Sequence, residues 1–320
     1  MTGLVTHHFL FTTEVVTPIE LDDHSGAALR GSLFDSVWRR FCNNKASPTC
    51  AACPLHAVCP VSALVAPLRE EHPRGRDIPR PYIVLPPLGQ ARRYEPGKEL
   101  LFGLTLFGTI IQLLPYVVLS IDLLEAGGLG RKLDRGRGRF SVKKVESYHP
   151  FNGELQVIYE AGKPLVGMPT LSVTADDIAT RAASLSKKRV TVNFLTPTRL
   201  VDQEQVLRHI AFRPLVHRLL DRLCALEEEY GTGDSHRSLV QCQELLQLAE
   251  TVQCEDDATY WEEVRSYSHR QMRSMPISGF QGKATFVGNL EPFRELLAWG
   301  ELVHIGKSVV KGNGWYKLEA

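Results

Sequence analysis

The same order of short strands and amphipathic helices occurs twice along this chain of 320 residues. In the first half, β-branched and aromatic runs predict strands, and an apolar residue at every fourth position from Leu29 to Phe41 predicts a helix. These strands cover residues 6–17, 100–107, 139–148 and 155–160. The order resumes after Lys187, where we expect strands at 189–194, 261–267, 282–286 and 315–318 and helices at 206–229, 239–252 and 292–299. Each sheet must bury one face under helices, which restricts the chain to two α+β halves.

Two halves of this kind, built from short strands, indicate two tandem ferredoxin-like domains. We expect the first over residues 1–165 and the second over 185–320, where a glycine-rich loop precedes the last strand. A cysteine-rich insertion at about 42–90 interrupts the first domain. With 43% hydrophobic and 23% charged residues, the composition is that of a folded protein, which excludes disorder, collagen and a small disulfide-bonded domain.

Residues 100–121 contain no charged side chain and are long enough to cross a bilayer. Glycine, glutamine and proline interrupt this stretch, and acidic rather than basic residues flank it. We therefore expect a buried strand up to Phe107, a turn at Gly108 and a buried helix from Ile110, with no membrane span. The first residues show no basic segment followed by an apolar one, so a cytoplasmic location is expected.

Positive charge is concentrated on glycine-rich segments, although Lys and Arg (37) nearly balance Asp and Glu (36) over the whole chain. Residues 131–144 hold seven basic residues and one acidic residue, with Gly136 and Gly138 between them. Residues 264–290 hold four basic residues and no acidic one, and the loop that contains Lys307 and Lys311 is also basic. Such segments are typical of a surface that binds a polyanion, which predicts a nucleic-acid partner.

Four of the seven cysteines lie within 18 residues, at Cys42, Cys50, Cys53 and Cys59. In a reducing compartment such a cluster binds metal more often than it forms disulfides. Four thiolates can enclose one zinc ion or one iron–sulfur cluster. The spacing resembles the iron–sulfur loop of the endonuclease III family of DNA glycosylases. We therefore predict a structural iron–sulfur cluster or zinc ion that fixes the insertion to the end of the first helix.

Several short motifs occur in a characteristic order along the chain. They are Gly26-Ala-Ala-Leu-Arg-Gly31 on the first helix, then Gly279-Phe-Gln-Gly-Lys-Ala-Thr-Phe286, Leu290-Glu-Pro-Phe293, His304-Ile-Gly-Lys307 and Gly312-Asn-Gly314. In order and spacing, these motifs resemble the CRISPR-associated endoribonucleases of the RAMP superfamily, which process precursor CRISPR RNA. The resemblance covers most of residues 1–42 and 98–320.

The resemblance implies two ferredoxin-like (RRM-type) domains that bind CRISPR repeat RNA across basic surfaces, with other CRISPR effector proteins as further partners. It also implies that the glycine-rich loop lies against the RNA, where glycines let backbone N–H groups approach phosphates. The residues expected to contact RNA are Arg30, Arg131, Lys132, Arg135, Arg137, Arg139, Arg270, Lys283, Gly306, Lys307, Lys311, Gly312 and Gly314.

The resemblance further implies RNA cleavage without a metal ion or other catalytic cofactor. The 2′-hydroxyl attacks the adjacent phosphorus and leaves a 2′,3′-cyclic phosphate and a 5′-hydroxyl. Such a reaction needs a base, an acid and a cation beside the phosphorane, and histidine suits proton transfer near neutral pH. In the family the histidine lies near the junction of the first strand and the first helix, which selects His24 as the catalytic residue here.

Departures from the family pattern leave other functions open. The family often adds a tyrosine and a lysine, whereas here no tyrosine precedes Tyr82 and the only lysine before Lys98 is Lys45. The family loop also begins with glycine where this chain has His304. The alternative is a non-catalytic RAMP subunit that binds crRNA in an effector complex. A DNA glycosylase, which the cysteine spacing suggests, conflicts with the strand content.

Overall fold

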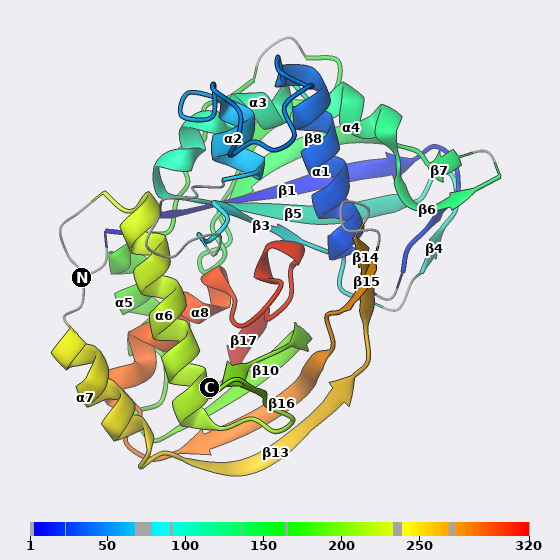
Figure 1. Ribbon diagram of the computed structural model, residues 1–320. Helices are drawn as coiled ribbons and strands as arrows, with labels where there is room; N and C mark the ends of the chain where they lie inside the picture. Colours follow the sequence, from blue (N-terminus) through cyan, green and yellow to red (C-terminus); the bar gives the residue numbers. More distant parts are fainter. Residues whose placement is uncertain are drawn as a thin grey trace. The chain divides into compact units, whose positions relative to one another are not determined.

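The computed structural model describes residues 3–22, 24–67, 78–89, 92–134, 136–163, 166–232, 239–268 and 273–319. The chain divides into two compact units. The N-terminal unit comprises Val5–Val173 with Glu229–Thr232, and the C-terminal unit comprises the other described residues (Figure 1). Each unit contains its own sheet and its own helices.

The sheet of the N-terminal unit has five antiparallel strands in the order β3-β5-β1-β8-β9. Their bounds are β1 (Thr6–Val15), β3 (Tyr82–Leu85), β5 (Glu99–Phe107), β8 (Phe140–Tyr148) and β9 (Leu155–Glu160). Strands β1, β3, β5 and β8 are arranged as in a ferredoxin-like domain, because β1 lies between β5 and β8 while β3 extends the sheet beyond β5. The last strand, β9, is added at the other edge.

Two helices of this unit, α1 and α4, lie side by side on one face of the sheet (Figure 1). The helices are α1 (Gly26–Phe41), α2 (Pro60–Val65), η1 (Gly108–Leu113), α3 (Leu114–Val118) and α4 (Ile121–Gly127). The apolar stripe of α1 explains its position, because Leu29, Leu33 and Val37 are all buried.

The apolar segment after β5 is broken rather than continuous. The helix predicted from Ile110 is divided into η1, α3 and α4. No single helix among the described residues is long and apolar enough to cross a membrane. The segments Gly108–Val118 and Ile121–Gly127 meet the length and composition criteria only as a pair, which is bent by 66°. Leu114 and Leu124 of this pair are buried.

The C-terminal unit repeats the connectivity around a four-stranded antiparallel sheet in the order β13-β16-β10-β17. Its strands are β10 (Arg189–Thr198), β13 (Gln253–Glu262), β16 (Gly279–Val287) and β17 (Tyr316–Glu319). Its helices are α5 (Ala175–Ala183), α6 (Phe212–Tyr230), α7 (Leu239–Ala249), η2 (Glu291–Phe293), α8 (Arg294–Val303) and η3 (Val309–Lys311). Two short hairpins are β11 (Val201–Asp202) with β12 (Gln205–Val206), and β14 (Arg265–Ser268) with β15 (Arg273–Pro276). The predicted α+β class with two tandem ferredoxin-like folds is confirmed.

Two predicted elements have different bounds in the structure. The long helix predicted over 206–229 begins at Phe212, because Val206 belongs to the β11–β12 hairpin. The strand predicted over 261–267 is divided between β13, which begins at Gln253, and β14. The start of β13 is acidic and exposed, so it shows none of the apolar alternation by which a strand is recognised.

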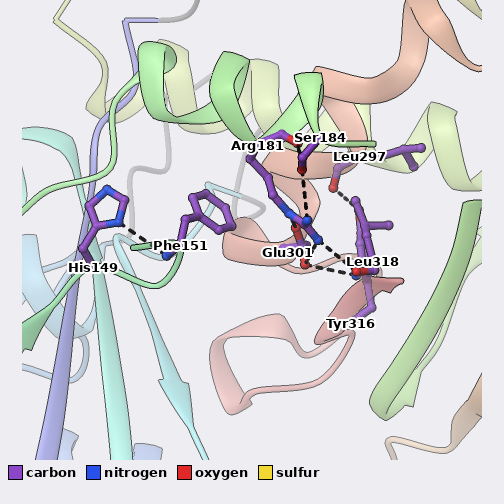
Figure 2. Close-up of polar contacts among 8 residues, drawn as sticks. All are labelled: His149, Phe151, Arg181, Ser184, Leu297, Glu301, Tyr316 and Leu318. Atoms are coloured by element: carbon purple, nitrogen blue, oxygen red, sulfur yellow. Dashed lines mark hydrogen bonds and ion pairs between the residues drawn. The ribbon is translucent and has the colours of Figure 1, made fainter. Parts of the chain in front are cut away.

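A buried ion pair joins α5, α8 and β17. Arg181 contacts Glu301 with Nε–Oε2 at 2.9 Å and Nη2–Oε1 at 3.3 Å, and Glu301 is only 3% exposed. The same carboxylate accepts the backbone N–H of Leu318 at 3.0 Å, and Arg181 Nη2 donates to the Leu318 carbonyl at 2.9 Å (Figure 2). The buried carboxylate therefore has both an ionic partner and a backbone partner, as a charge removed from water requires.

Alkaline pH should destabilise the N-terminal unit through Tyr148 at the end of β8. Burial raises the pKa of Tyr148 from 10.0 to about 12. The folded state then holds the proton more tightly than the unfolded chain, so this stabilisation is present below pH 10 and is lost as the pH rises to about 12. We expect the free energy of unfolding to fall by on the order of 2 kcal/mol over that range.

Denaturant unfolding on either side of this range measures the effect. Tyr148→Phe should lose less stability than wild type as the pH rises, whereas Tyr260→Phe, at a side chain 60% exposed, should follow wild type. Equal alkaline losses in wild type and Tyr148→Phe would contradict the assignment.

Candidate nucleic-acid interface

His24 lies next to Ser25, the N-cap residue of α1, and is 7% exposed. The first turn of the helix begins at Ser25, whose carbonyl accepts the N–H of Leu29 at 3.0 Å. The Ser25 side chain makes no capping hydrogen bond to the helix. The first N–H groups of α1, which carry partial positive charge, are therefore not capped by the residue best placed to do so.

A glycine-rich hairpin packs directly on the short strand that leads to His24. The elements are β2 (Ile19–Glu20), β4 (Arg93–Tyr94), which pairs with β2, and the hairpin of β6 (Leu129–Leu133) and β7 (Gly136–Gly138). Gly130 has φ +84°, and a Cβ there would collide with the carbonyl oxygen of Glu20. A Cβ at Gly138 would collide with the carbonyl of Pro18. Glycine at both positions lets the two backbones meet.

The basic side chains of this hairpin are exposed. Arg131 Nε contacts Asp22 Oδ1 at 2.5 Å. The Arg131 guanidinium is thereby fixed beside Asp22, which lies two positions before His24. The other exposed basic residues of the segment are Lys132, Arg137 and Arg139. Arg135 lies outside the described residues. The structure therefore brings four of the predicted RNA contacts together with the strand that precedes the predicted catalytic histidine.

Arg30, a further predicted contact, lies half-buried on α1. Its guanidinium carbon is 5.5 Å from the centroid of the Phe34 ring. Burial raises the pKa of the fully buried Tyr82, and the charges of Arg30 and Arg80 oppose that rise. Tyr82 is therefore a core residue, and it does not replace the tyrosine that the resemblance leads one to expect beside the histidine.

Two other histidines of this unit have structural partners. His8 lies between the hydroxyl groups of Thr6 and Thr105, at 2.8 and 3.0 Å. His149 Nδ1 accepts the backbone N–H of Phe151 at 3.4 Å (Figure 2). Both are buried, so they contribute to the interior rather than to a surface for RNA.

In the C-terminal unit, the glycine-rich loop between α8 and β17 begins at His304. Its φ of +57° and ψ of 173° are typical of glycine, the residue that the family resemblance leads one to expect there. The histidine is 1% exposed, its ring stacks on Trp315 at 5.7 Å, and its Nδ1 contacts the Asn313 carbonyl at 3.2 Å. Packing therefore holds a side chain in a backbone conformation that favours glycine.

The later glycines of this loop are used within the chain. Gly312 N–H donates to the Val309 carbonyl at 2.8 Å and Gly314 N–H donates to the Pro197 carbonyl at 3.1 Å, and both glycines are buried. Each of these two N–H groups therefore already has a carbonyl partner, and the RNA contact expected at Gly312 and Gly314 stays a prediction. Gly306, with φ +86°, is half-buried.

The predicted cations of this unit differ in exposure. Lys307 is exposed on the loop, whereas Lys311 is half-buried. Lys283 on β16 contacts Glu319 at 2.7 Å, and this hydrogen bond lowers the pKa of that carboxyl. Arg270 lies outside the described residues. Among the predicted RNA contacts of this loop, Lys307 is therefore the most exposed to solvent.

The four clustered cysteines are half-buried and form no disulfide bond. Burial raises the pKa of the Cys50 thiol, and the nearby thiols of Cys59, Cys42 and Cys53 raise it further. The four sulfur atoms therefore occupy one region. Over the described part of the chain, no three His, Cys, Asp or Glu side chains already form a site for a metal ion.

Two family models match the sequence. One is described as an N-terminal domain and covers residues 4–171, and the other, CRISPR-associated endoribonuclease Cas6, covers residues 192–316. The C-terminal part of the chain, residues 192–316, matches the Cas6 endoribonuclease family. The Cas6 match includes the glycine-rich loop and β16, where the sequence motifs lie. A search of curated proteins finds no match.

Solved structures of Cas6 proteins share the fold. A Cas6 product complex has a TM-score of 0.58 at 16% identity, with 98% of this chain and 99% of that chain covered. Thermus thermophilus Cas6 has a TM-score of 0.56 at 16% identity, with 99% of both chains covered. A chain of a partial Cas6-RT-Cas1–Cas2 complex has a TM-score of 0.59 at 11% identity, with 99% of this chain and 46% of that chain covered. At these identities the likeness is one of fold.

Sequence reasoning missed one residue of the surface around His24. Asp22 fixes Arg131 beside the segment that carries His24, but the two residues are 109 positions apart. No local pattern links them. Only the docking of the glycine hairpin on β2 reveals the pair.

Proposed function

We propose that this chain binds CRISPR repeat RNA and cleaves precursor crRNA. The observation that carries the proposal is the docking of the basic hairpin on the strand that leads to His24, in a chain whose C-terminal part matches an endoribonuclease family. Arg131 brings exposed positive charge next to Asp22, two positions before the histidine. An RNA backbone drawn to the hairpin by its phosphates would therefore pass close to His24.

The proposed reaction is attack of the 2′-hydroxyl on the adjacent phosphorus. His24 accepts the 2′-hydroxyl proton, the O2′–P bond forms and the P–O5′ bond breaks, and the leaving oxygen takes a proton from water. The products are a 2′,3′-cyclic phosphate and a 5′-hydroxyl. Arg131 and the first N–H groups of α1 would stabilise the additional negative charge of the phosphorane, so the proposed reaction uses no metal ion.

Labelled repeat RNA of the host, incubated with the protein in EDTA, tests this proposal, with a 2′-deoxy substitution at the scissile position as control. Cleavage of the first RNA only, with a cyclic phosphate end, is the expected result. Cleavage of the 2′-deoxy RNA would overturn the 2′-hydroxyl mechanism. Tight binding without cleavage would support the non-catalytic RAMP subunit, and no binding would overturn the RNA partner itself.

Removal of single charges from the hairpin should weaken RNA binding without changing its sequence preference. Arg137→Ala and Arg139→Ala each remove an exposed cation that we expect to contact the RNA phosphates rather than the bases. Each is expected to reduce the slope of log affinity against log salt by about 1. Binding titrations at several salt concentrations measure the slope. Lys163→Ala, an exposed lysine of the same unit that pairs with Glu160 at 2.7 Å, serves as the matched control.

Other CRISPR proteins are also proposed as partners. Support comes from the chain of a Cas6-RT-Cas1–Cas2 complex that shares this fold. Co-purification from the host of the tagged full-length chain, with and without ribonuclease, would separate protein contacts from contacts made through shared RNA.

A further inference from the structure

The loop of residues 42–59 connects α1 to α2 (Figure 1). It has no apolar core of its own. It contains turns and bends but neither helix nor strand, and Leu55 and Val58 are 47% and 82% exposed. Its four cysteines, in contrast, are all half-buried. The loop therefore leaves its two large apolar side chains in solvent and covers its thiols more than those side chains.

The cysteines stand at fixed points of the backbone. Cys42 N–H donates to the last turn of α1 at 2.9 Å, and the Cys59 carbonyl accepts a hydrogen bond of 3.0 Å from the first turn of α2. Cys53 N–H donates to the Cys50 carbonyl at 3.2 Å and closes a turn between the two helices. Because α1 and α2 pack against each other, the first and last thiols are fixed by the helices and the middle two by the turn.

One polar side chain donates a hydrogen bond to a sulfur atom of this loop. Asn44 Nδ2 lies 3.5 Å from Cys53 Sγ and donates to it. A donor of this kind stabilises negative charge on sulfur, and such contacts commonly surround the thiolate ligands of metal centres.

We infer that Cys42, Cys50, Cys53 and Cys59 bind one metal centre through four thiolates, either a zinc ion or an iron–sulfur cluster, which closes the loop between α1 and α2. The bonds from metal to sulfur take the place of the apolar core that this loop lacks. The thiols share a region without yet enclosing an ion, so binding draws the turn toward the two helix ends. This closure disrupts no packing, because no large apolar side chain of the loop is buried. The inference is independent of RNA cleavage.

Metal analysis of the full-length protein, purified under nitrogen without chelator, tests the inference. We expect one centre per chain. Bound zinc in a colourless protein would identify a zinc site. Bound iron, together with acid-labile sulfide and visible thiolate-to-iron absorption, would identify an iron–sulfur cluster. Protein stripped by a chelator should also take up Co²⁺ with thiolate-to-cobalt charge transfer. Absence of bound metal together with failure to bind Co²⁺ overturns the inference.

Variants and chemical labelling locate the centre. Cys50→Ser and Cys53→Ser should lose the metal, whereas Cys254→Ser, at an exposed cysteine outside the loop, and His56→Ala, at an exposed histidine inside it, should retain it. If the loop variants fail to fold, brief alkylation of the native wild-type protein replaces them. The four loop cysteines should resist alkylation until chelator is added, while Cys254 reacts at once. Loop cysteines that react as fast as Cys254 with and without chelator overturn the inference.

Discussion

RNA cleavage by the His24→Ala protein is expected to be roughly 10²–10⁴-fold slower than cleavage by wild type, with little change in RNA affinity. The loss reflects the absence of the group proposed to accept the 2′-hydroxyl proton. Affinity should persist, because the exposed charges that attract the backbone lie on the β6–β7 hairpin rather than on the histidine. Single-turnover cleavage with saturating protein isolates the chemical step from binding.

The control for this prediction must separate lost chemistry from lost structure. His24 is buried, so thermal unfolding of the variant is measured alongside cleavage. His209→Ala removes an imidazole whose side chain is 89% exposed in the C-terminal unit, and it should cleave at the wild-type rate. Wild-type cleavage by a folded His24→Ala protein would remove this residue from the mechanism. Loss of affinity in parallel with the rate would make it a binding residue instead.

The Glu301→Ala substitution should lower the free energy of unfolding of the C-terminal unit by about 3–5 kcal/mol. Arg181 would keep a largely buried guanidinium without its carboxylate, since its side chain is only 22% exposed. The backbone N–H of Leu318 would lose its acceptor on the last strand at the same time. Denaturant unfolding, followed by a probe in this unit, measures the change.

Two further variants test whether the loss of stability in Glu301→Ala comes from an unpaired buried charge. Replacing both partners, as Arg181→Met with Glu301→Leu, should recover a large part of the loss, because an apolar pair leaves no unpaired buried charge. Glu250→Ala breaks an exposed pair with Arg213 in the same unit and should cost less than about 1 kcal/mol. A double variant as unstable as Glu301→Ala would show that packing, rather than charge, sets the cost.

Strong local patterns predicted the fold well. β-branched and aromatic residues identify β1 and β16, and the spacing of Leu29, Leu33 and Val37 identifies α1, because burial of one face leaves a periodic trace in the sequence. Elements that bury little leave no such trace. The exposed, acidic start of β13 was missed for this reason. The β11–β12 hairpin was also missed, because its turn uses Gln203 and Glu204 at positive φ rather than the asparagine and glycine that mark such turns.

The candidate site was predictable in its parts but not in its assembly. The basic, glycine-rich segment and His24 were both predicted from the sequence, yet the docking of this segment on the strand that leads to His24 depends on Gly130 and Gly138. A backbone contact between distant segments has no local pattern. In the C-terminal loop, where the sequence suggests phosphate-binding amides, Gly312 and Gly314 use their N–H groups in internal hydrogen bonds. Composition alone does not distinguish these two uses of glycine.

In the β6–β7 hairpin, the residues that anchor the backbone differ from the residues that face solvent. Two glycines hold its backbone against β2, while the side chains at positions 131, 132, 137 and 139 project into solvent. The one exposed ion pair described among them, between Arg131 and Asp22, adds less than about 1 kcal/mol to stability. Mutation can therefore exchange these four side chains without disturbing the scaffold. Related chains can thus differ in how strongly they hold an RNA backbone while inheriting the same hairpin.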